Sequence, residues 1–174
     1  RNTNNLGFEG TYIGPEDDAT GNTIDLITHK SGFKVVYLSK MGLNDMRGYL
    51  ADVTNIFSEN GVSIEHDTTG VDGVAIAVES GANLEDVIRD LREKNMVDGD
   101  GISVDENKSF ICMVGNNINT NSAVYGTVGS TLASHNIGMQ PFAGSRTSIP
   151  IAIPASFELD ALRYLHREFF GTAK

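Results

Sequence analysis

Hydrophobic residues in the first half of the chain change from strand-like to helix-like spacing and back. A short apolar run, or alternation of apolar and polar residues, predicts a strand, whereas apolar residues three or four positions apart predict a helix. By these criteria we expect strands at 33–39, 62–64, 74–78 and 102–104, and helices through 50–57 and 84–91. Asn60-Gly61 supplies a left-handed stop after the first helix, and Asn83 suits the N-cap of the second.

The same pattern returns later in the chain at a constant offset of 75 positions. Val62 and Ile64, for example, correspond to Ile137 and Met139 with no gap between them. The second copy predicts strands at 110–114, 137–141 and 148–153 and helices near 122–134 and 157–170. Chance rarely preserves both kinds of spacing through a whole unit, so we interpret the pattern as a duplication. The predicted fold class is α+β, with two ferredoxin-like βαββαβ modules whose helices cover one face of antiparallel sheets.

The second copy lacks the closing strand of the first. Segment 23–29 precedes the first copy and has no other predicted partner, so we expect it to complete the second sheet. The first module would then be inserted into the second. The predicted division is a preceding segment and linker at 1–21, a first module at 30–105, and a second module made of 22–29 and 106–174.

Charge and composition exclude several classes of function. The formal net charge is -10 and the basic residues are scattered, which disfavours binding to nucleic acid. A single cysteine cannot form an internal disulfide, and no basic-then-apolar signal segment opens the sequence. Apolar stretches are far shorter than the roughly 20 residues that span a bilayer. We therefore expect a soluble, cytoplasmic protein.

Several short motifs, in their order along the chain, resemble the C-terminal regulatory region of aspartate kinases, which consists of tandem ACT domains. They are RNTNN at 1–5, EGT at 9–11, ITHK at 27–30, RGYLADV at 47–53, VSIEH at 62–66, TGVD at 69–72, VGNNI at 114–118 and NI at 136–137. The VSIEH and TGVD pair is similar to a variant found in monofunctional bacterial enzymes. Leu6 and Glu9 replace two prolines of the family pattern.

The resemblance implies an enzyme that phosphorylates the β-carboxylate of L-aspartate with ATP and Mg²⁺. Segment 1–21 would then be the end of the catalytic domain and a linker, so the remaining chain would hold the regulatory part. No glycine-rich phosphate loop with a partner lysine is present in the sequence. We therefore expect no turnover, no catalytic residue and no cofactor in this chain. Its implied roles are feedback inhibition by lysine, threonine or both, and dimerisation.

A site for a free amino acid needs donors for a carboxylate and acceptors for an ammonium group. The loop at 44–48 leads into a helix whose unpaired N–H groups suit a carboxylate, and the strand at 63–65 could hold the amine through its backbone. The resemblance places the effector at 45–50 and 64–65. The candidate effector-binding residues are Asp45, Met46, Gly48, Tyr49, Leu50, Ser63, Ile64, Glu65, Thr69 and Asp72.

Two acidic candidates, Glu65 and Asp72, would favour an effector with a cationic side chain such as lysine. The alternative is that both are solvated ends of strands and turns, and that Gly48 serves only packing at a helix start. At the offset of 75, the second module has Ala123, Gln140 and Thr147 in place of Gly48, Glu65 and Asp72. We expect this module to support assembly, with binding of a neutral effector such as threonine as the alternative.

The remaining reactive side chains predict no further chemistry. The four histidines and Cys112 lack the spacing of metal ligands, so we expect no metal site. Cys112 lies in an apolar run and is expected to be a small core residue.

Unpaired edges of ferredoxin-like sheets favour pairing between copies, so we expect a two-fold homodimer. A scaffold that binds no ligand, and a stand-alone regulator of another enzyme, are the competing hypotheses. The RNTNN motif at the start of the sequence favours a truncated kinase over an independent regulator.

Overall fold

A computed structural model describes residues 24–171 of the chain. The predicted end of the catalytic domain and linker, 1–21, therefore lies outside the described residues. The strands are β1 (Leu26–Ser39), β2 (His66–Thr69), β3 (Gly73–Glu79), β4 (Ile102–Val114), β5 (Gln140–Pro141) and β6 (Ser148–Pro154). The helices are α1 (Tyr49–Glu59), α2 (Glu85–Glu93), α3 (Ser122–Ser134) and α4 (Glu158–Phe170), with short 3-10 helices η1 (Leu43–Asp45), η2 (Ile118–Thr120) and η3 (Ala155–Phe157).

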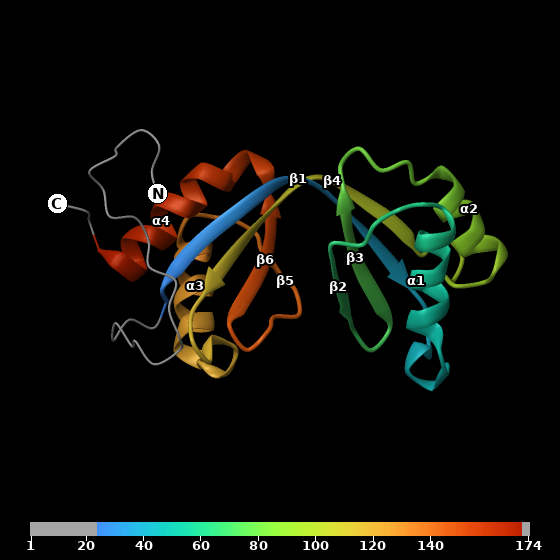
Figure 1. Cartoon of the computed structure of the whole chain (residues 1–174), viewed down its shortest axis with the longest axis horizontal. Coiled ribbons are helices and arrows are strands. Elements are labelled where there is room, and N and C mark those ends of the chain that lie inside the picture. Colours follow the sequence, from blue (N-terminus) through green and yellow to red (C-terminus); the bar gives the residue numbers. More distant parts are fainter. Residues whose placement is uncertain (1–23, 172–174) are drawn as a thin grey trace, which may run out of the picture.

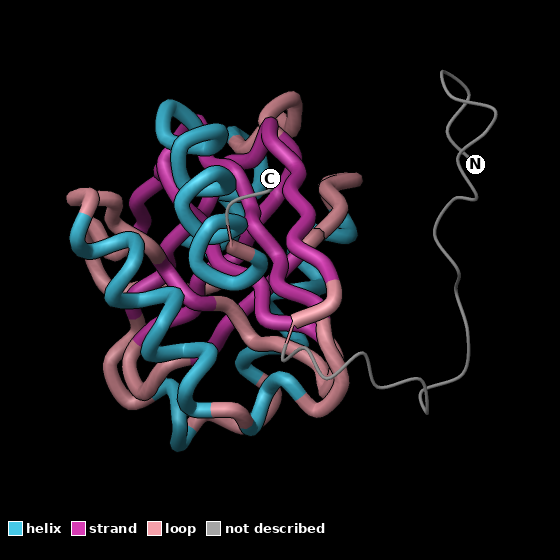
Figure 2. Tube along the Cα trace, turned by 90° about the vertical axis from the view of Figure 1, so that its left-hand side faces the viewer, coloured by secondary structure: helices cyan, strands magenta, loops and turns pink. Residues whose placement is uncertain are grey.

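All six strands form one antiparallel sheet in the order β2-β3-β1-β4-β6-β5. The two central strands, β1 and β4, run across the whole molecule, and each belongs to both halves (Figure 1). The sheet curls, with α1 and α2 outside one half and α3 and α4 outside the other (Figure 1). Figure 2 looks onto the helix layer of the second half, with strands behind it. The predicted α+β class, with antiparallel strands and helices on one face, is confirmed.

The N-terminal part of β1 pairs with the second half of the molecule. Leu26 to Ser31 lie opposite Val114 to Ser109, and β6 continues the sheet on the other side of β4. The part of β1 from Phe33 onward pairs with β3 and with the start of β4. This pairing is the one expected if the segment before the first module supplies a strand to the second.

Several strand predictions differ from the structure, including the one at 137–141, of which only Gln140–Pro141 forms a strand. The sequence predicts separate strands at 33–39 and 102–104, whereas β1 and β4 continue through polar stretches into the other half. Backbone hydrogen bonds need no apolar side chain, so the hydrophobic pattern missed the crossing. The strand expected at 62–64 begins only at His66, although the N–H of Glu65 already donates to Ala77 O at 2.9 Å.

Each half has its own hydrophobic core between its helices and its part of the sheet. The first includes Val53 and Phe57 of α1 with Ile76 of β3, and the second includes Leu132 of α3 with Ile151 of β6. No residue belongs to both cores. A third cluster fills the concave, helix-free face of the sheet, where the two halves meet. The helices and the alternating strands thus build two bodies on one shared sheet.

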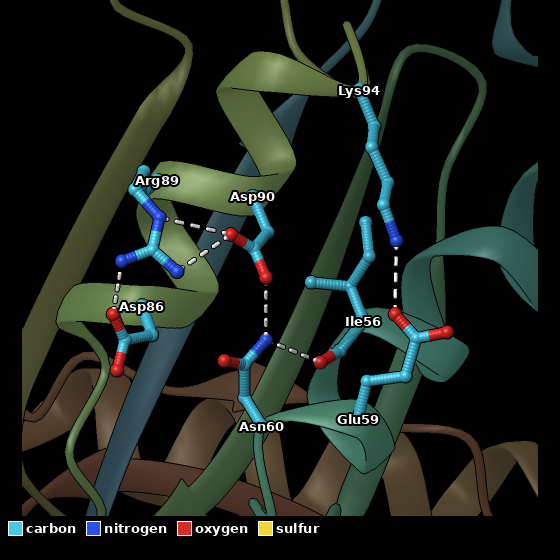
Figure 3. Close-up of polar contacts among 7 residues, drawn as sticks. All are labelled: Ile56, Glu59, Asn60, Asp86, Arg89, Asp90 and Lys94. Carbon is cyan, nitrogen blue, oxygen red and sulfur yellow. Dashed lines mark hydrogen bonds and ion pairs between the residues drawn. The ribbon is translucent and has the colours of Figure 1, made fainter.

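Polar contacts join the two helices of the first half (Figure 3). The Asn60 side chain, at the end of α1, donates to Ile56 O and to Asp90 Oδ2, both at 2.9 Å. The hydrogen bond from Asn60, followed by the neighbouring Arg89 guanidinium, lowers the pKa of Asp90. Gly61 follows at φ 69°, so the predicted left-handed stop of this helix is confirmed. In the second half, the rings of His135 and Tyr164 stack between α3 and α4 at 3.5 Å.

Candidate functional site

The start of α1 is exposed and has an unusual backbone. Gly48 occupies the N-cap position at φ 78°, and no side chain within the described residues caps the first turn. A Cβ at Gly48 would meet no atom within 4 Å, so the left-handed conformation, and not a packing contact, explains the glycine. First-turn amides that lack an internal partner can bind a carboxylate. The packing alternative for Gly48 is therefore not supported.

The residues around this helix start divide into exposed and anchoring ones. Asp45, Met46 and Leu50 are exposed, whereas Tyr49 is buried. The Tyr49 hydroxyl donates to Met96 O at 2.7 Å, and burial raises the pKa of this phenol. The buried Tyr49 thus anchors the start of α1, while the exposed side chains around it are accessible to a ligand.

An ion pair between Lys40 and Asp98 lies just after the end of β1, where the loop to α1 begins. The Lys40 ammonium is 2.8 Å from Asp98 Oδ1, and the Met41 N–H donates to Asp98 Oδ2 at 2.7 Å. Both contacts lower the pKa of Asp98, the lysine more than the amide. Sequence reasoning missed this pair because its members lie far apart in the chain. We infer that the pair positions the loop and leaves other groups to contact an effector.

The turn between β2 and β3 lies at the same end of the first half. The Lys40 N–H donates to Asp72 O at 2.9 Å, and the neighbouring Val71 side chain is 74% exposed. Thr69 ends β2 opposite Val74. In Figure 1 the β2–β3 turn and the loop before α1 both lie at the lower edge of the first half. Asp72 and Thr69 therefore lie at the same end of the first half as the start of α1.

Ser63, Ile64 and Glu65 lie at the opposite end of the same half. They follow the C-terminal end of α1, whose 11 residues separate them from Gly48, which corresponds to about 16 Å at 1.5 Å per residue. Within one chain, the structure therefore does not bring this segment to the helix start. Glu65 pairs beside Ala77 and Asp72 precedes Gly73, a separation along β3 of about 13 Å. The two carboxylates do not share a pocket within one copy.

Glu65 already has an ionic partner. Its Oε2 is 3.5 Å from the Lys30 ammonium, which also lies 3.3 Å from Glu79 Oε1. The hydrogen bond to Glu79, followed by the charge of Glu65, raises the pKa of Lys30. These side chains are exposed, so the contacts are weak and a ligand ammonium can compete with Lys30 for Glu65.

The second half repeats the backbone of this region with different chemistry. The Gly115 N–H donates to Thr147 O at 3.0 Å, as Lys40 does to Asp72 at the offset of 75. Here, however, Asn121 is the N-cap and its Oδ1 accepts from the Ala123 N–H at 3.1 Å. The start of α3 therefore has a side-chain cap, which the start of α1 lacks. Comparing Asn121 with Met46, the residue 75 positions earlier, could have revealed this from sequence.

Formal charge also separates the two regions. Residues 30–105 contain 14 Asp or Glu and 7 Lys or Arg, a net charge of -7, whereas residues 106–174 contain 4 and 5, a net charge of +1. A cationic ligand is therefore attracted to the first region more than to the second.

The chain offers little for metal or nucleophile chemistry. Among residues 24–171, no three His, Cys, Asp or Glu side chains are grouped as metal ligands would be. Cys112 is half-buried in β4, and burial raises the pKa of its thiol, which disfavours the reactive thiolate. No helix in this part of the chain is both long enough and apolar enough to cross a bilayer.

Comparison with known proteins agrees with the sequence motifs. No family model matches the chain. Aspartokinase 3 of Bacillus subtilis is 28% identical over 177 residues, which cover 98% of this chain and 38% of that protein. The resemblance to aspartate kinases is confirmed. The chain spans less than half the length of this relative.

Solved structures show which part of such kinases has this fold. The regulatory subunit of aspartate kinase from Thermus thermophilus, in its ligand-free form, aligns over 99% of its length and 85% of this chain (TM-score 0.71, 20% identity). Clostridium acetobutylicum aspartate kinase aligns over 35% of its length and 84% of this chain (TM-score 0.74, 21% identity). Escherichia coli aspartokinase III, in complex with lysine and aspartate, aligns over 34% of its length and 86% of this chain (TM-score 0.67, 19% identity). The chain therefore has the fold of the regulatory part.

Proposed function

We propose that this chain is the regulatory region of an aspartate kinase and that its first module binds lysine as a feedback effector. The uncapped start of α1 carries the proposal, because its amides suit the carboxylate of an amino acid. Asp72 at the same end, and the net charge of the surrounding module, favour a cationic side chain. The lysine complex of the Escherichia coli relative supports this choice. Threonine remains the alternative effector.

We further propose that the site is completed by a second copy of the chain. Within one copy, Ser63–Glu65 and the start of α1 lie at opposite ends of the module. β2 is an edge strand, and antiparallel pairing of two β2 edges about a two-fold axis reverses one copy relative to the other. Such pairing would place Ser63–Glu65 of one copy beside Gly48 and Asp72 of its partner. A homodimer thus reconciles the candidate residues with their positions.

The catalytic function belongs to the rest of the proposed enzyme. Phosphorylation of aspartate, with its ATP and Mg²⁺, would take place outside this chain, which we expect to be inactive alone. The insertion of the first module into the second is supported by the pairing of β1 with β4. Location in the cytoplasm also stays a prediction.

Ligand-induced stabilisation tests the proposal. Thermal unfolding of the chain would be measured with millimolar lysine, threonine, methionine, aspartate or meso-diaminopimelate. A ligand at 100 times its Kd stabilises by about 2.7 kcal/mol, whereas a scaffold gains nothing. We expect stabilisation by lysine that is weakened in Glu65→Ala and Asp72→Ala. The matched control Thr147→Ala, at the position equivalent to Asp72, should leave it unchanged. No stabilisation by any ligand would favour the scaffold hypothesis.

Mixing two defective variants tests whether the site is shared. In a heterodimer of Glu65→Ala and Asp72→Ala chains, one of the two sites would have both residues intact and the other would have neither. Calorimetric titration of the mixture should therefore recover, in part of the sites, the lysine affinity that is weakened in either variant alone. If each site lay within one chain, mixing would restore nothing.

A further inference from the structure

The two modules touch each other through a contact much smaller than either core. The cluster on the concave face consists of Phe33, Val35, Ala75, Ala77, Phe110, Phe142 and Ala152. It has 7 buried residues, three of them alanine, against 15 and 13 in the two cores. Burial stabilises roughly in proportion to apolar area, so this contact should open before either module unfolds.

Both strands that connect the modules are irregular at the same level. Gly32 of β1 has φ 86° and Asn107 of β4 has φ 58°, and the β1–β4 register shifts between Ser31 and Val35. Left-handed residues at such shifts mark bulges, where a strand bends. Within the described residues, the chain passes between the modules only through β1 and β4. These two points therefore form a hinge between two separately packed bodies.

His66 crosses this contact from the first module. Its ring stacks on Phe110 at 4.5 Å and lies edge-on to Phe142 at 6.2 Å. Phe110 and Phe142 also pack together at 4.9 Å. Burial lowers the pKa of His66, although Glu65 and Asp67 oppose the shift and Lys30 adds to it. The imidazole is therefore neutral near pH 7 and packs as an aromatic ring.

The second module makes the reciprocal contact. The Tyr37 hydroxyl of β1 donates to Gln140 Oε1 of β5. Gln140 is the residue that stands 75 positions after Glu65. Thus both equivalent segments, the one that contains Glu65 and His66 and the one that contains Gln140, reach the contact between modules.

We propose that His66 is a positioning residue that transmits the state of Ser63–Glu65 to the second module. The inference rests on the proposed function, because Ser63–Glu65 is half of the proposed effector site. His66 is covalently next to Glu65, and consecutive Cα atoms are only about 3.8 Å apart. An effector that fixes the backbone of 63–65 therefore also fixes the ring that lies on Phe110 and Phe142. Binding at the first module then shifts the hinge towards the closed arrangement.

Amide hydrogen exchange without ligand tests the structural half of this proposal. The Phe142 N–H donates to Pro150 O at 3.1 Å inside the β5–β6 pairing of the second module. Its exchange should report fraying of this edge, which packing of the Phe142 ring on His66 and Phe110 opposes. Loss of one aromatic partner in His66→Ala should speed its exchange about three- to tenfold. His66→Phe keeps a ring and should restore the slow rate. His135→Ala, which removes the stack on Tyr164 in the helix layer, is the matched control. Unchanged Phe142 exchange in His66→Ala would overturn the proposal.

Exchange with lysine tests the transmission itself. In the unsubstituted chain, saturating lysine should slow exchange at Phe142. In His66→Ala, lysine should bind within about threefold of its original affinity, yet the slowing at Phe142 should be lost. If lysine still slows exchange there without the ring, or never slows it despite binding, the proposal is wrong. If lysine does not bind at all, the proposed effector fails and the ligand-free exchange alone decides the role of His66.

Discussion

The loops that precede α1 and α3 follow the same backbone path and then separate at one residue. η1 and η2 occupy equivalent positions, and Met46 and Asn121 after them have nearly equal backbone angles, φ −89° and −87° with ψ 104° and 94°. The Asn121 side chain then caps its helix. Met46 has no acceptor to offer, and the chain passes through left-handed Gly48 before α1 begins. The difference between Met46 and Asn121 therefore decides whether the helix start of each module lacks or has a side-chain cap.

This difference shows how a duplicated module can divide its tasks without changing its fold. In the second module the Asn121 side chain satisfies one donor at the helix start, the Ala123 N–H, whereas no side chain caps α1. Gln140, which replaces Glu65, instead accepts a hydrogen bond from Tyr37 at the contact between modules. We interpret the second module as the supporting copy and the first as the sensing one.

The largest effects should come from the two cores, which test whether the modules are equally stable. Phe57→Ala in the first core and its equivalent Leu132→Ala in the second each remove a fully buried side chain. Unfolding free energy should fall by about 3–5 kcal/mol for the phenylalanine and about 2–5 kcal/mol for the leucine. Chemical denaturation monitored by circular dichroism would measure both. Because β1 and β4 are shared, we expect one transition in each case, and two separate transitions would contradict that view.

Substitutions at the two helix starts should have smaller effects on stability. Gly48→Ala places a Cβ in a left-handed conformation at a cost of about 1–2 kcal/mol. Ala123→Gly, at the matched position inside α3, should cost about 0.5–1 kcal/mol through backbone entropy. Thermal denaturation of both variants would compare them. A neutral Gly48→Ala would mean that the left-handed turn is not maintained in solution.

Moving the cap tests the comparison directly. Asn121→Ala should destabilise α3 by about 1 kcal/mol, while Met46→Asn, in the same backbone conformation, should gain up to about 1 kcal/mol if it caps α1. By analogy with Asn121 and the Ala123 N–H, the new side chain would accept from the Gly48 N–H, a donor at the proposed effector site, so lysine affinity should drop. Calorimetry would provide both readouts. Unaltered lysine affinity in a stabilised Met46→Asn chain would remove the helix start from the proposed site.

The smallest expected effect is a pH dependence at His66. Its folded-state pKa is lowered by burial, so the unfolded chain binds more protons as the pH falls through about 6.5. Unfolding free energy should therefore decrease slightly below pH 6.5 and stay level between pH 7 and 8. His66→Phe should flatten this decrease, as denaturation at several pH values would show. An equal slope in both proteins would exclude His66 as its source.

Much of the fold could be predicted from the spacing of apolar residues. The interval of 75 positions located both copies, and α3 matches its predicted bounds because its buried face repeats at helical spacing. The crossing of β1 and β4 could not be found in this way. Residues such as Ser31 and Ser109 pair through the backbone, and their side chains carry no periodic signal.

The candidate site was predicted in its parts but not in its arrangement. Gly48 and Asp72 lie at the same end of the module, whereas Glu65 lies at the other end. The lengths of α1 and of the strand that follows it could be predicted from sequence. Only the direction of β2 relative to α1 shows which end of the strand lies beside the start of the helix. The His66 side chain was considered only as a possible metal ligand, and its spacing did not support one. Its contacts with Phe110 and Phe142 could not be predicted, since these residues are distant in the chain.

By itself, the sequence determined the duplicated α+β unit, the two apolar faces and the chemical difference between Gly48 and Ala123. These features depend on local spacing and on residue type, which are written along the chain. The tertiary structure alone decided that the sheet is continuous, that it curls its helix-free face onto itself, and that Glu65 and Asp72 are apart. Those outcomes depend on contacts between segments far apart in sequence, where packing and backbone pairing, and not local preference, set the geometry.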